Sequence, residues 1–458
     1  MESKTPTRRA KSKALTAANL EALGAARLAQ LLMEAADEQP AVKRRARLAL
    51  AASVGPDALA QEIEKPLEAL DAARGRIPWR RVKALRQDLD LLRASIAGPL
   101  AEADPAAAAA LMLRFLGLER GLLARTKDAK GEVAQIFAQA LADLAALAPA
   151  VKATPPGFVP AIMAVLADLR LAAMGPVAQA LVPALDVLAV AELRARIETE
   201  TATHRRIHAG WRAALQALLD AQGDAAAYAA TWSASEVILP PIGARIAARF
   251  LKAGLLDQAA RALELSDPFA DGQRPKAPDP GLAAWEGASI DFLEARGEVE
   301  AAQAARWAAF LRHLSPDLLR AYLRGLTGFD DVEATERALE HAQDFPEAMP
   351  ALAFLVAWPA LKEAAALVEA RSDDLDGDEI DILEPAARAL EGRYPLAGAL
   401  VLRALIRAAA RSGQADRIKR ARTWMLEAAS LSHQIADFSG HPDHAAFEVA
   451  VRRISTRL

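Results

Sequence analysis

The sequence predicts an all-α protein built from helical hairpins, of the tetratricopeptide type or a related α-solenoid. Alanine accounts for 113 of the 458 residues, and it has the highest helix propensity because it loses no side-chain entropy on folding. Leu, Glu and Arg, which are also common here, favour helices as well. No stretch alternates β-branched and aromatic residues in the way that predicts a strand. The hairpins are unevenly spaced, so we expect irregular repeats.

The N-terminal half is expected to begin with two helices joined by a glycine turn. Thr16 or Asn19 can cap the first helix, and Gly24 separates it from the second. Asp104 stands before a proline, a pair that predicts an N-cap and the first helical position of another helix. Apolar spacing predicts further helices at 41–52, 56–74 and 79–97, and one long helix over 187–222. An apolar helix pair is expected before this long helix, with breaks near Pro176 and Pro183.

Four helical hairpins are predicted in the C-terminal half. In two of them a glycine, Gly254 or Gly297, stands in the turn, where a left-handed backbone is needed. In units of this kind each hairpin buries its apolar face against its neighbours. The predicted helix pairs are 244–250 with 256–265, 285–295 with 299–314, 350–360 with 361–372, and 385–392 with 395–411.

The segment 266–281 holds four prolines and two glycines, a composition that excludes a helix and predicts a loop or linker. We place a boundary there. The expected organisation is a disordered basic arm at 1–18, an N-terminal helical region at 19–100, a central helical region at 101–265, this Pro-rich loop, and a C-terminal hairpin region at 282–458.

Several stretches of the chain resemble a bacterial domain family of unknown function. They are 19–32 (NLEALGAARLAQLL), 351–361 (ALAFLVAWPAL), 376–378, 382–387, 394–397 and 441–448. The resemblance extends over nearly the whole chain. Its landmarks are packing and turn residues, so it implies a helical family and no particular activity.

Glu200, His204 and His208 are the strongest metal-ligand candidates. They are spaced four residues apart and would share one face of a helix over 187–222. Such a row spans about 12 Å, so the three side chains cannot all reach one ion. A second helix or a second subunit would have to supply the missing ligand. The alternative is a semi-polar face packed against another helix, and we expect no cofactor.

Two further patterns suggest metals but lack essential ligands. The acidic run 373–381 resembles a calcium loop with Gly377 at the sixth position, yet Ser372 and Leu383 then occupy the first and twelfth positions, where carboxylates are required. Its acidic residues are better explained as helix caps. His441 and His444 lie close together, but without cysteine or an obvious third ligand a zinc site is not expected, and Asp443 is predicted to cap the last helix.

The N-terminal region carries most of the positive charge. Residues 1–100 hold 18 Lys and Arg against 12 Asp and Glu, whereas the rest holds 38 against 47. Basic clusters of this kind can bind phosphates, although aromatic side chains for base stacking are scarce beyond Trp79. The candidate nucleic-acid contacts are Lys43, Arg44, Arg45, Arg47, Arg80, Arg81 and Lys83.

These patterns favour an interaction protein over an enzyme. The sequence contains no nucleotide-binding glycine loop, no nucleophile elbow and no His-Glu-x-x-His motif, and it has no cysteine. The leading hypothesis is a non-catalytic scaffold that binds another protein on its helical surface. The alternatives are a nucleic-acid-associated protein that uses the basic N-terminal region and an enzyme of unrecognised class. The sequence does not decide whether the protein associates with a second copy of itself.

A cytoplasmic location is expected from the absence of a secretory signal at the N-terminus. The most membrane-like stretch, 171–191, contains Pro176, Pro183 and Asp186, which are costly inside a bilayer. We therefore expect no membrane span.

Overall fold

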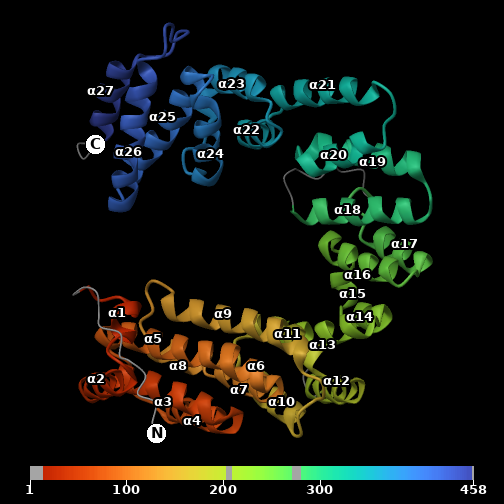
Figure 1. Ribbon diagram of the computed structural model, residues 1–458. Helices are drawn as coiled ribbons and strands as arrows, with labels where there is room; N and C mark the ends of the chain where they lie inside the picture. Colours follow the sequence, from red (N-terminus) through yellow and green to blue (C-terminus); the bar gives the residue numbers. More distant parts are fainter. Residues whose placement is uncertain (1–13, 203–208, 271–279, 456–458) are drawn as a thin grey trace. The chain divides into compact units, whose positions relative to one another are not determined.

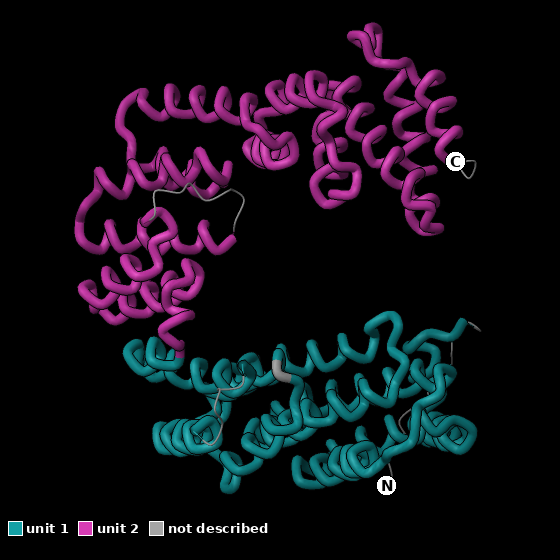
Figure 2. The backbone as a smooth tube through the Cα atoms, turned by 180° about the vertical axis from the view of Figure 1, so that it is seen from behind, with its two compact units in different colours: residues 1–231 teal, residues 232–458 magenta. Residues whose placement is uncertain are grey.

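A computed structural model describes residues 14–202, 209–270 and 280–455, and within them the protein is all-α (Figure 1). No strand occurs over these residues; a single isolated bridge joins Ile77 to Thr126. The chain forms two compact units, Met1–Thr231 and Trp232–Leu458 (Figure 2). The regions predicted from the sequence, 19–100, 101–265 and 282–458, have other boundaries, and the proline-rich segment lies within the second unit.

The first unit is formed by fourteen α-helices over the described residues. They are α1 (Ala17–Glu21), α2 (Ala25–Glu38), α3 (Pro40–Val54), α4 (Pro56–Ala72), α5 (Trp79–Ser95), α6 (Ala101–Ala103), α7 (Pro105–Gly117), α8 (Glu119–Arg125), α9 (Glu132–Leu147), α10 (Phe158–Asp168), α11 (Leu171–Leu181), α12 (Val187–Ala202), α13 (Ala209–Gln222) and α14 (Ala225–Ala230). One π-helical turn, Ile96–Leu100, follows α5.

The predicted caps of this unit are confirmed. The Thr16 side chain accepts a hydrogen bond from the backbone N–H of Asn19 at 3.3 Å, and Gly24 separates α1 from α2. The Asp104 carboxylate accepts from Ala106 and Ala107, both at 3.0 Å, ahead of the proline that opens α7. Each cap satisfies backbone N–H groups that the first helical turn leaves without partners.

The helices of the first unit lie in successive rows in Figure 1. α3 packs on α4, α4 on α7, α7 and α5 on α9, and α9 on α11. The core between the rows includes Phe115 and Phe137, whose ring centroids are 5.3 Å apart and whose side chains are buried. Small alanines at the contacts, such as Ala108 and Ala140, let the helices approach closely.

The predicted helix break at Pro176 is wrong, whereas the break at Pro183 is confirmed. Pro176 lies inside α11, and the chain changes to a 3₁₀ turn only at Val182–Ala184. Pro176 is the sixth residue of α11, so its missing N–H removes a hydrogen bond from the second turn only. Packing of α11 against α9 and α13 outweighs that loss.

One segment of the described chain, Glu132–Ala150, has the length and apolar composition of a membrane span. It comprises α9 and the turn after it. Val133, Phe137 and Leu144 on this helix are buried against other helices of the unit. Core helices share this composition, and α9 occupies such a position.

The second unit contains thirteen helices over the described residues. They are α15 (Ala234–Val237), α16 (Pro240–Lys252), α17 (Leu256–Leu265), α18 (Pro280–Ala295), α19 (Val299–His313), α20 (Pro316–Arg324), α21 (Asp330–Gln343), α22 (Ala348–Ala357), α23 (Leu361–Ala370), α24 (Ile380–Glu391), α25 (Pro395–Ser412), α26 (Ala415–Ser432) and α27 (His444–Ile454). In Figure 1 they follow one another from green to blue.

The four predicted helix pairs of this unit are present. α16 packs on α17, α18 on α19, α22 on α23, and α24 on α25. Gly254 and Gly297 stand in the first two turns with φ of 73° and 78°, the left-handed conformation for which glycine was predicted. The fourth pair begins earlier than expected, because Pro385 lies inside α24.

The unit's core is centred on aromatic residues and on α25. The rings of Phe310 and Phe354 are 5.3 Å apart and both side chains are buried. α25 is buried along most of its length, from Leu396 to Ala410.

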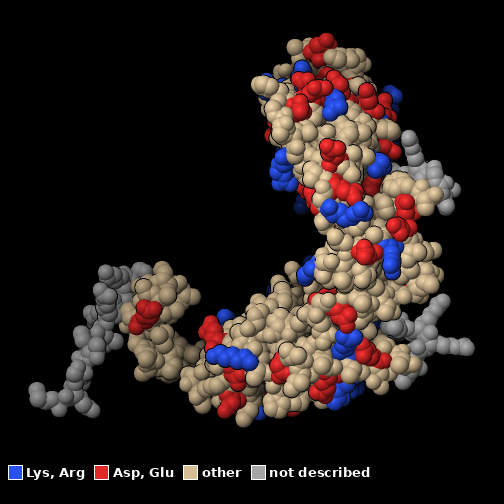
Figure 3. Space-filling view, turned by 90° about the vertical axis from the view of Figure 1, so that its right-hand side faces the viewer, with Lys and Arg blue, Asp and Glu red and all other residues tan. Residues whose placement is uncertain are grey.

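Charge is distributed differently over the two units. In the face shown in Figure 3, acidic side chains gather near one end of the second unit, whereas acidic and basic side chains are interspersed over the first.

The buried Arg403 of α25 holds the C-terminal segment in place. Its Nη1 donates to the carbonyl of Pro442 at 2.8 Å, and its guanidinium lies 5.0 Å from the ring centroid of Phe447 and 5.6 Å from that of Phe438. Only 2% of this residue is exposed, and burial lowers its pKa. Its Nε and Nη2 find no hydrogen-bond partner among the described residues.

Acidification is expected to weaken the second unit through His444. Burial, and then the charge of Arg403, lower the pKa of His444 below its ordinary value of 6.5. The folded state therefore favours the neutral imidazole, so stability is full above pH 6.5 and falls as the pH drops toward the folded pKa. Urea unfolding at a series of pH values should show a smaller loss on acidification in His444→Gln than in the wild type. Equal losses would contradict this assignment.

Candidate binding groove

The candidate site is an open groove of about 460 Å³ formed by α3, α4 and α5. Most of the surface that lines it is apolar, although five of its twelve lining residues are charged. The lining residues are Arg44, Arg47, Leu48, Glu62, Lys65, Pro66, Ala69, Leu70, Leu85, Asp88, Leu91 and Leu92.

Each helix contributes one stripe of residues at helical spacing. On α4 the lining positions begin at Glu62 and recur three, four, seven and eight residues later. Positions so spaced lie on one face of a helix. The stripes of α3 and α5 follow the same rule. Three helix faces therefore converge on a space that no fourth helix of the described chain occupies.

Apolar side chains at the groove are only partly covered. Leu48 and Leu92 are buried at its base, whereas Leu70, Leu85 and Leu91 are half-buried. Removing the apolar surface of a leucine from water is favourable by about 25 cal/mol for each Å². A ligand that covers these leucines therefore gains binding free energy from their burial.

Pro66 shapes the middle of the groove. It lies inside α4 and has no backbone N–H, so the carbonyl of Glu62 cannot accept the usual hydrogen bond from four residues ahead. Proline inside a helix also clashes with that carbonyl and bends the helix. The ring lines the groove at the position where the helical hydrogen bonding is interrupted.

Most of the charged side chains that line the groove are paired with one another, and one arginine is available to a ligand. Arg44 Nη2 lies 2.5 Å from Asp88 Oδ1 and joins α3 to α5, while Lys65 and Glu62 pair at 3.6 Å on α4. Arg47 forms no ion pair with any residue in the described part of the chain. A ligand with an apolar stripe and one carboxylate would match this lining.

The basic residues predicted as phosphate contacts are divided between the groove and the surrounding surface. Arg44 and Arg47 line the groove, and Lys43 pairs with Asp37 at 3.7 Å. Arg80 stacks on the exposed Trp79, 5.3 Å from its ring centroid. The groove does not include the remaining candidates, which are Arg45 on α3 and Arg80, Arg81 and Lys83 near the start of α5.

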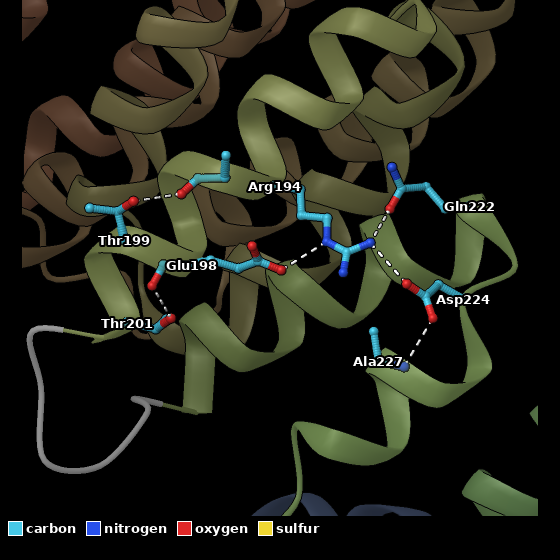
Figure 4. Close-up of polar contacts among 8 residues, drawn as sticks. Arg194, Glu198, Thr199, Thr201, Gln222, Asp224 and Ala227 are labelled. Atoms are coloured by element: carbon cyan, nitrogen blue, oxygen red, sulfur yellow. Dashed lines mark hydrogen bonds and ion pairs between the residues drawn. The ribbon is translucent and has the colours of Figure 1, made fainter.

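The single helix predicted over 187–222 is wrong. Arg194 on α12 donates to Gln222 on α13 at 2.9 Å and to Asp224 at 3.0 Å (Figure 4). In one continuous helix Arg194 and Gln222 would be about 42 Å apart. α12 and α13 are therefore two helices packed side by side.

The predicted metal ligands lie at the end of α12 and beyond it. Glu200 is exposed near the end of α12. His204 and His208 lie outside the described residues. Within the described residues, no group of three or more His, Asp or Glu side chains could hold a metal ion.

The acidic run that resembles a calcium loop is bound by arginines. Arg371 pairs with Asp374 at 2.9 Å and Arg417 with Asp378 at 2.6 Å. The Asp376 carboxylate accepts from the backbone N–H of Asp378 at 3.0 Å. Glu379 occupies the N-cap position of α24 without a side-chain capping bond, and Asp381 lies in the first turn, where the helix dipole favours a carboxylate as predicted.

The two histidines near the C-terminus have separate environments. His441 Nε2 lies 3.1 Å from the carbonyl oxygen of Glu369, and His444 lies beside Arg403 and Phe447. Asp443 caps α27, as predicted, by accepting from the N–H of Ala446 at 2.8 Å.

The sequence did not identify the apolar part of the groove. Leu85, Leu91 and Ala69 fit the helical pattern of core residues, and an apolar stripe has the same pattern whether a neighbouring helix covers it or not. The only local signal was Pro66, a proline inside an otherwise regular helical stretch.

A comparison with protein families gives a match over most of the chain. The family model described as a family of unknown function, DUF6880, matches residues 10–209 and 198–457. No curated protein shows significant similarity to the chain. The match confirms the resemblance to an uncharacterised domain family that the sequence indicated. Because the two matched ranges cover most of its length, the chain belongs to the DUF6880 family.

Proposed function

We propose that this protein is a cytoplasmic, non-catalytic interaction protein that binds an amphipathic helix of another protein in the groove of α3, α4 and α5. The observation that carries the proposal is the groove itself, with three converging helix faces and half-exposed leucines. Its volume of about 460 Å³ lies within the range of small ligand pockets, about 300–1,000 Å³. Helices that dock in such grooves insert apolar anchors three, four and seven residues apart.

The proposal also includes the finer fold assignment. Consecutive helix pairs in the second unit pack in sequence order, which supports an irregular α-solenoid of the tetratricopeptide type. Such a surface would offer further contacts to the same partner protein.

The partner helix should carry an apolar stripe and a carboxylate at its flank. The stripe would cover Leu70, Leu85 and Leu91, and the carboxylate would meet Arg47. Arg44 and Lys65 already pair with Asp88 and Glu62. A strongly acidic partner such as a nucleic acid would gain fewer contacts here than an amphipathic helix.

Filling the groove is expected to abolish binding. Ala69→Trp places an indole in the groove, while Gln61→Trp places it on the exposed part of the same helix, outside the lining. A library of displayed helical peptides is selected on the wild-type protein, and selected peptides are then measured by fluorescence anisotropy. We expect Ala69→Trp to weaken binding at least tenfold (about 1.4 kcal/mol) and Gln61→Trp to leave it unchanged.

Two outcomes would contradict the proposal. One is the selection of peptides that bind Ala69→Trp as well as they bind the wild type. The other is the absence of any enriched peptide with apolar residues at helical spacing.

A further inference from the structure

A second surface on α3 lies next to the groove and is fully open. Lys43, Arg47, Leu50 and Val54 are spaced by four, three and four residues, and all four are exposed. Leu50 is 67% exposed and Val54 is 79% exposed. This spacing keeps them in one row of about 16 Å along the helix. The row is basic at its N-terminal end and apolar at its C-terminal end.

A row with the opposite order lies on α21 in the second unit. Phe329, Glu333, Glu336 and Glu340 follow the spacing four, three, four, and Val332 lies beside them. Phe329 is 88% exposed and Val332 is 52% exposed. This row is apolar at its N-terminal end and acidic toward its C-terminal end. The opposite face of α21 buries Ala334, Ala338 and Ala342.

Neither row is covered within the described structure. Glu333, Glu336 and Glu340 form no ion pair with any described residue. Among the described residues the only acidic partner of Lys43 is Asp37, at 3.7 Å, and both side chains are more than half exposed. Large apolar side chains exposed together with unpaired charges are typical of interaction surfaces.

The two rows are complementary when the helices run antiparallel. Both extend over twelve residues, so Lys43 then meets Glu340, Arg47 meets Glu336, Leu50 meets Glu333 beside Val332, and Val54 meets Phe329. Antiparallel helices also bring opposite ends of their dipoles together.

We propose that two copies of this protein associate through an antiparallel contact between α3 of one copy and α21 of the other. The occupant of the α3 surface is therefore a second copy of the chain. The contact is a single pair of helices with exposed ion pairs, so the association is weak and salt-dependent. The contact shares Arg47 with the groove, whereas Lys43, Leu50 and Val54 are not among the groove's lining residues.

Sedimentation velocity over a concentration series tests the contact. The wild type should show reversible association that weakens as salt is added. Leu50→Glu disrupts the α3 row and Phe329→Glu disrupts the α21 row, and each variant alone should associate at least tenfold more weakly. An equimolar mixture of the two should recover association, because α21 of the Leu50→Glu copy and α3 of the Phe329→Glu copy are intact.

Charge exchange provides a second measurement. Lys43→Glu should weaken association, and the added change Glu340→Lys should restore it by reversing both members of the pair. Leu426→Glu is the matched control, since Leu426 is 74% exposed and lies on α26, outside both rows. Circular dichroism confirms that each variant is folded.

The proposal is overturned by any of three results. These are a wild type that stays monomeric at the highest concentration reached, an association that Leu50→Glu and Phe329→Glu leave unchanged, or a mixture of these two variants that remains as weak as each alone.

Discussion

Gly377→Ala is expected to destabilise the second unit by about 3 kcal/mol or more. A Cβ atom at this position would lie 2.1 Å from the carbonyl oxygen of Ala404 and 2.7 Å from the Cβ of Ala408. Both of these residues belong to the buried helix α25. Backbone and Cβ atoms of a packed helix cannot rotate away, so the loop or the helix has to move.

Gly392→Ala is the matched control for this variant. No atom lies within 4 Å of the Cβ that it adds, and its backbone is α-helical with φ of −76°. It should be neutral or stabilising by about 0.4–1 kcal/mol, since alanine restricts the unfolded chain. Urea unfolding measures both variants, and hydrogen exchange should locate the loss in α24 and α25. A wild-type midpoint for Gly377→Ala would contradict the packing described.

Glu286→Ala is expected to cost about 3–5 kcal/mol, as is usual when one partner of a buried ion pair is removed. The Glu286 side chain is 6% exposed, and its two oxygens lie 2.6 Å from Arg312 Nε and 2.5 Å from His313 Nε2. These contacts join α18 to α19. Without the carboxylate, the mostly covered His313 and the partly exposed guanidinium of Arg312 lose their acceptor.

The destabilisation caused by losing Glu286 should depend on whether its polar partners remain buried without an acceptor. The double variant Glu286→Leu/His313→Leu replaces two buried polar groups by apolar ones, and it should recover much of the stability that Glu286→Ala loses. Glu300→Ala, which removes an exposed carboxylate from α19, should change the unfolding free energy by less than about 0.5 kcal/mol. If Glu286→Ala were as mild as Glu300→Ala, the cluster would contribute little to holding the two helices together.

The helices could be predicted where local signals agree with tertiary packing. The Gly254 and Gly297 turns, the Asp104 cap and the Asp443 cap depend on residues within a few positions of one another. The division between α12 and α13 does not depend on such local signals. Residues 203–208 contain neither glycine nor proline, and the two helices are distinguished by the contact between Arg194 and Gln222, which are far apart in sequence.

The candidate site could be predicted only in part. Arg44 and Arg47 were identified by charge, and the structure places them at the groove. The apolar lining was missed, because whether Leu85 and Leu91 are covered depends on where α3 and α4 lie. Periodicity shows which face of a helix is apolar, but it contains no information about a neighbour that is absent.

Site-specific photo-crosslinking tests the central claim most directly. A photoreactive amino acid is introduced at Ala69 in the groove or, as the control, at Gln61 on the exposed side of α4, in cells that produce the protein. We predict that the Ala69 position crosslinks to one protein, through a segment with apolar residues at helical spacing and an acidic flank, and that the Gln61 position does not. Equal crosslinking at both positions, or crosslinks at Ala69 spread over unrelated segments, would contradict the groove as a docking site.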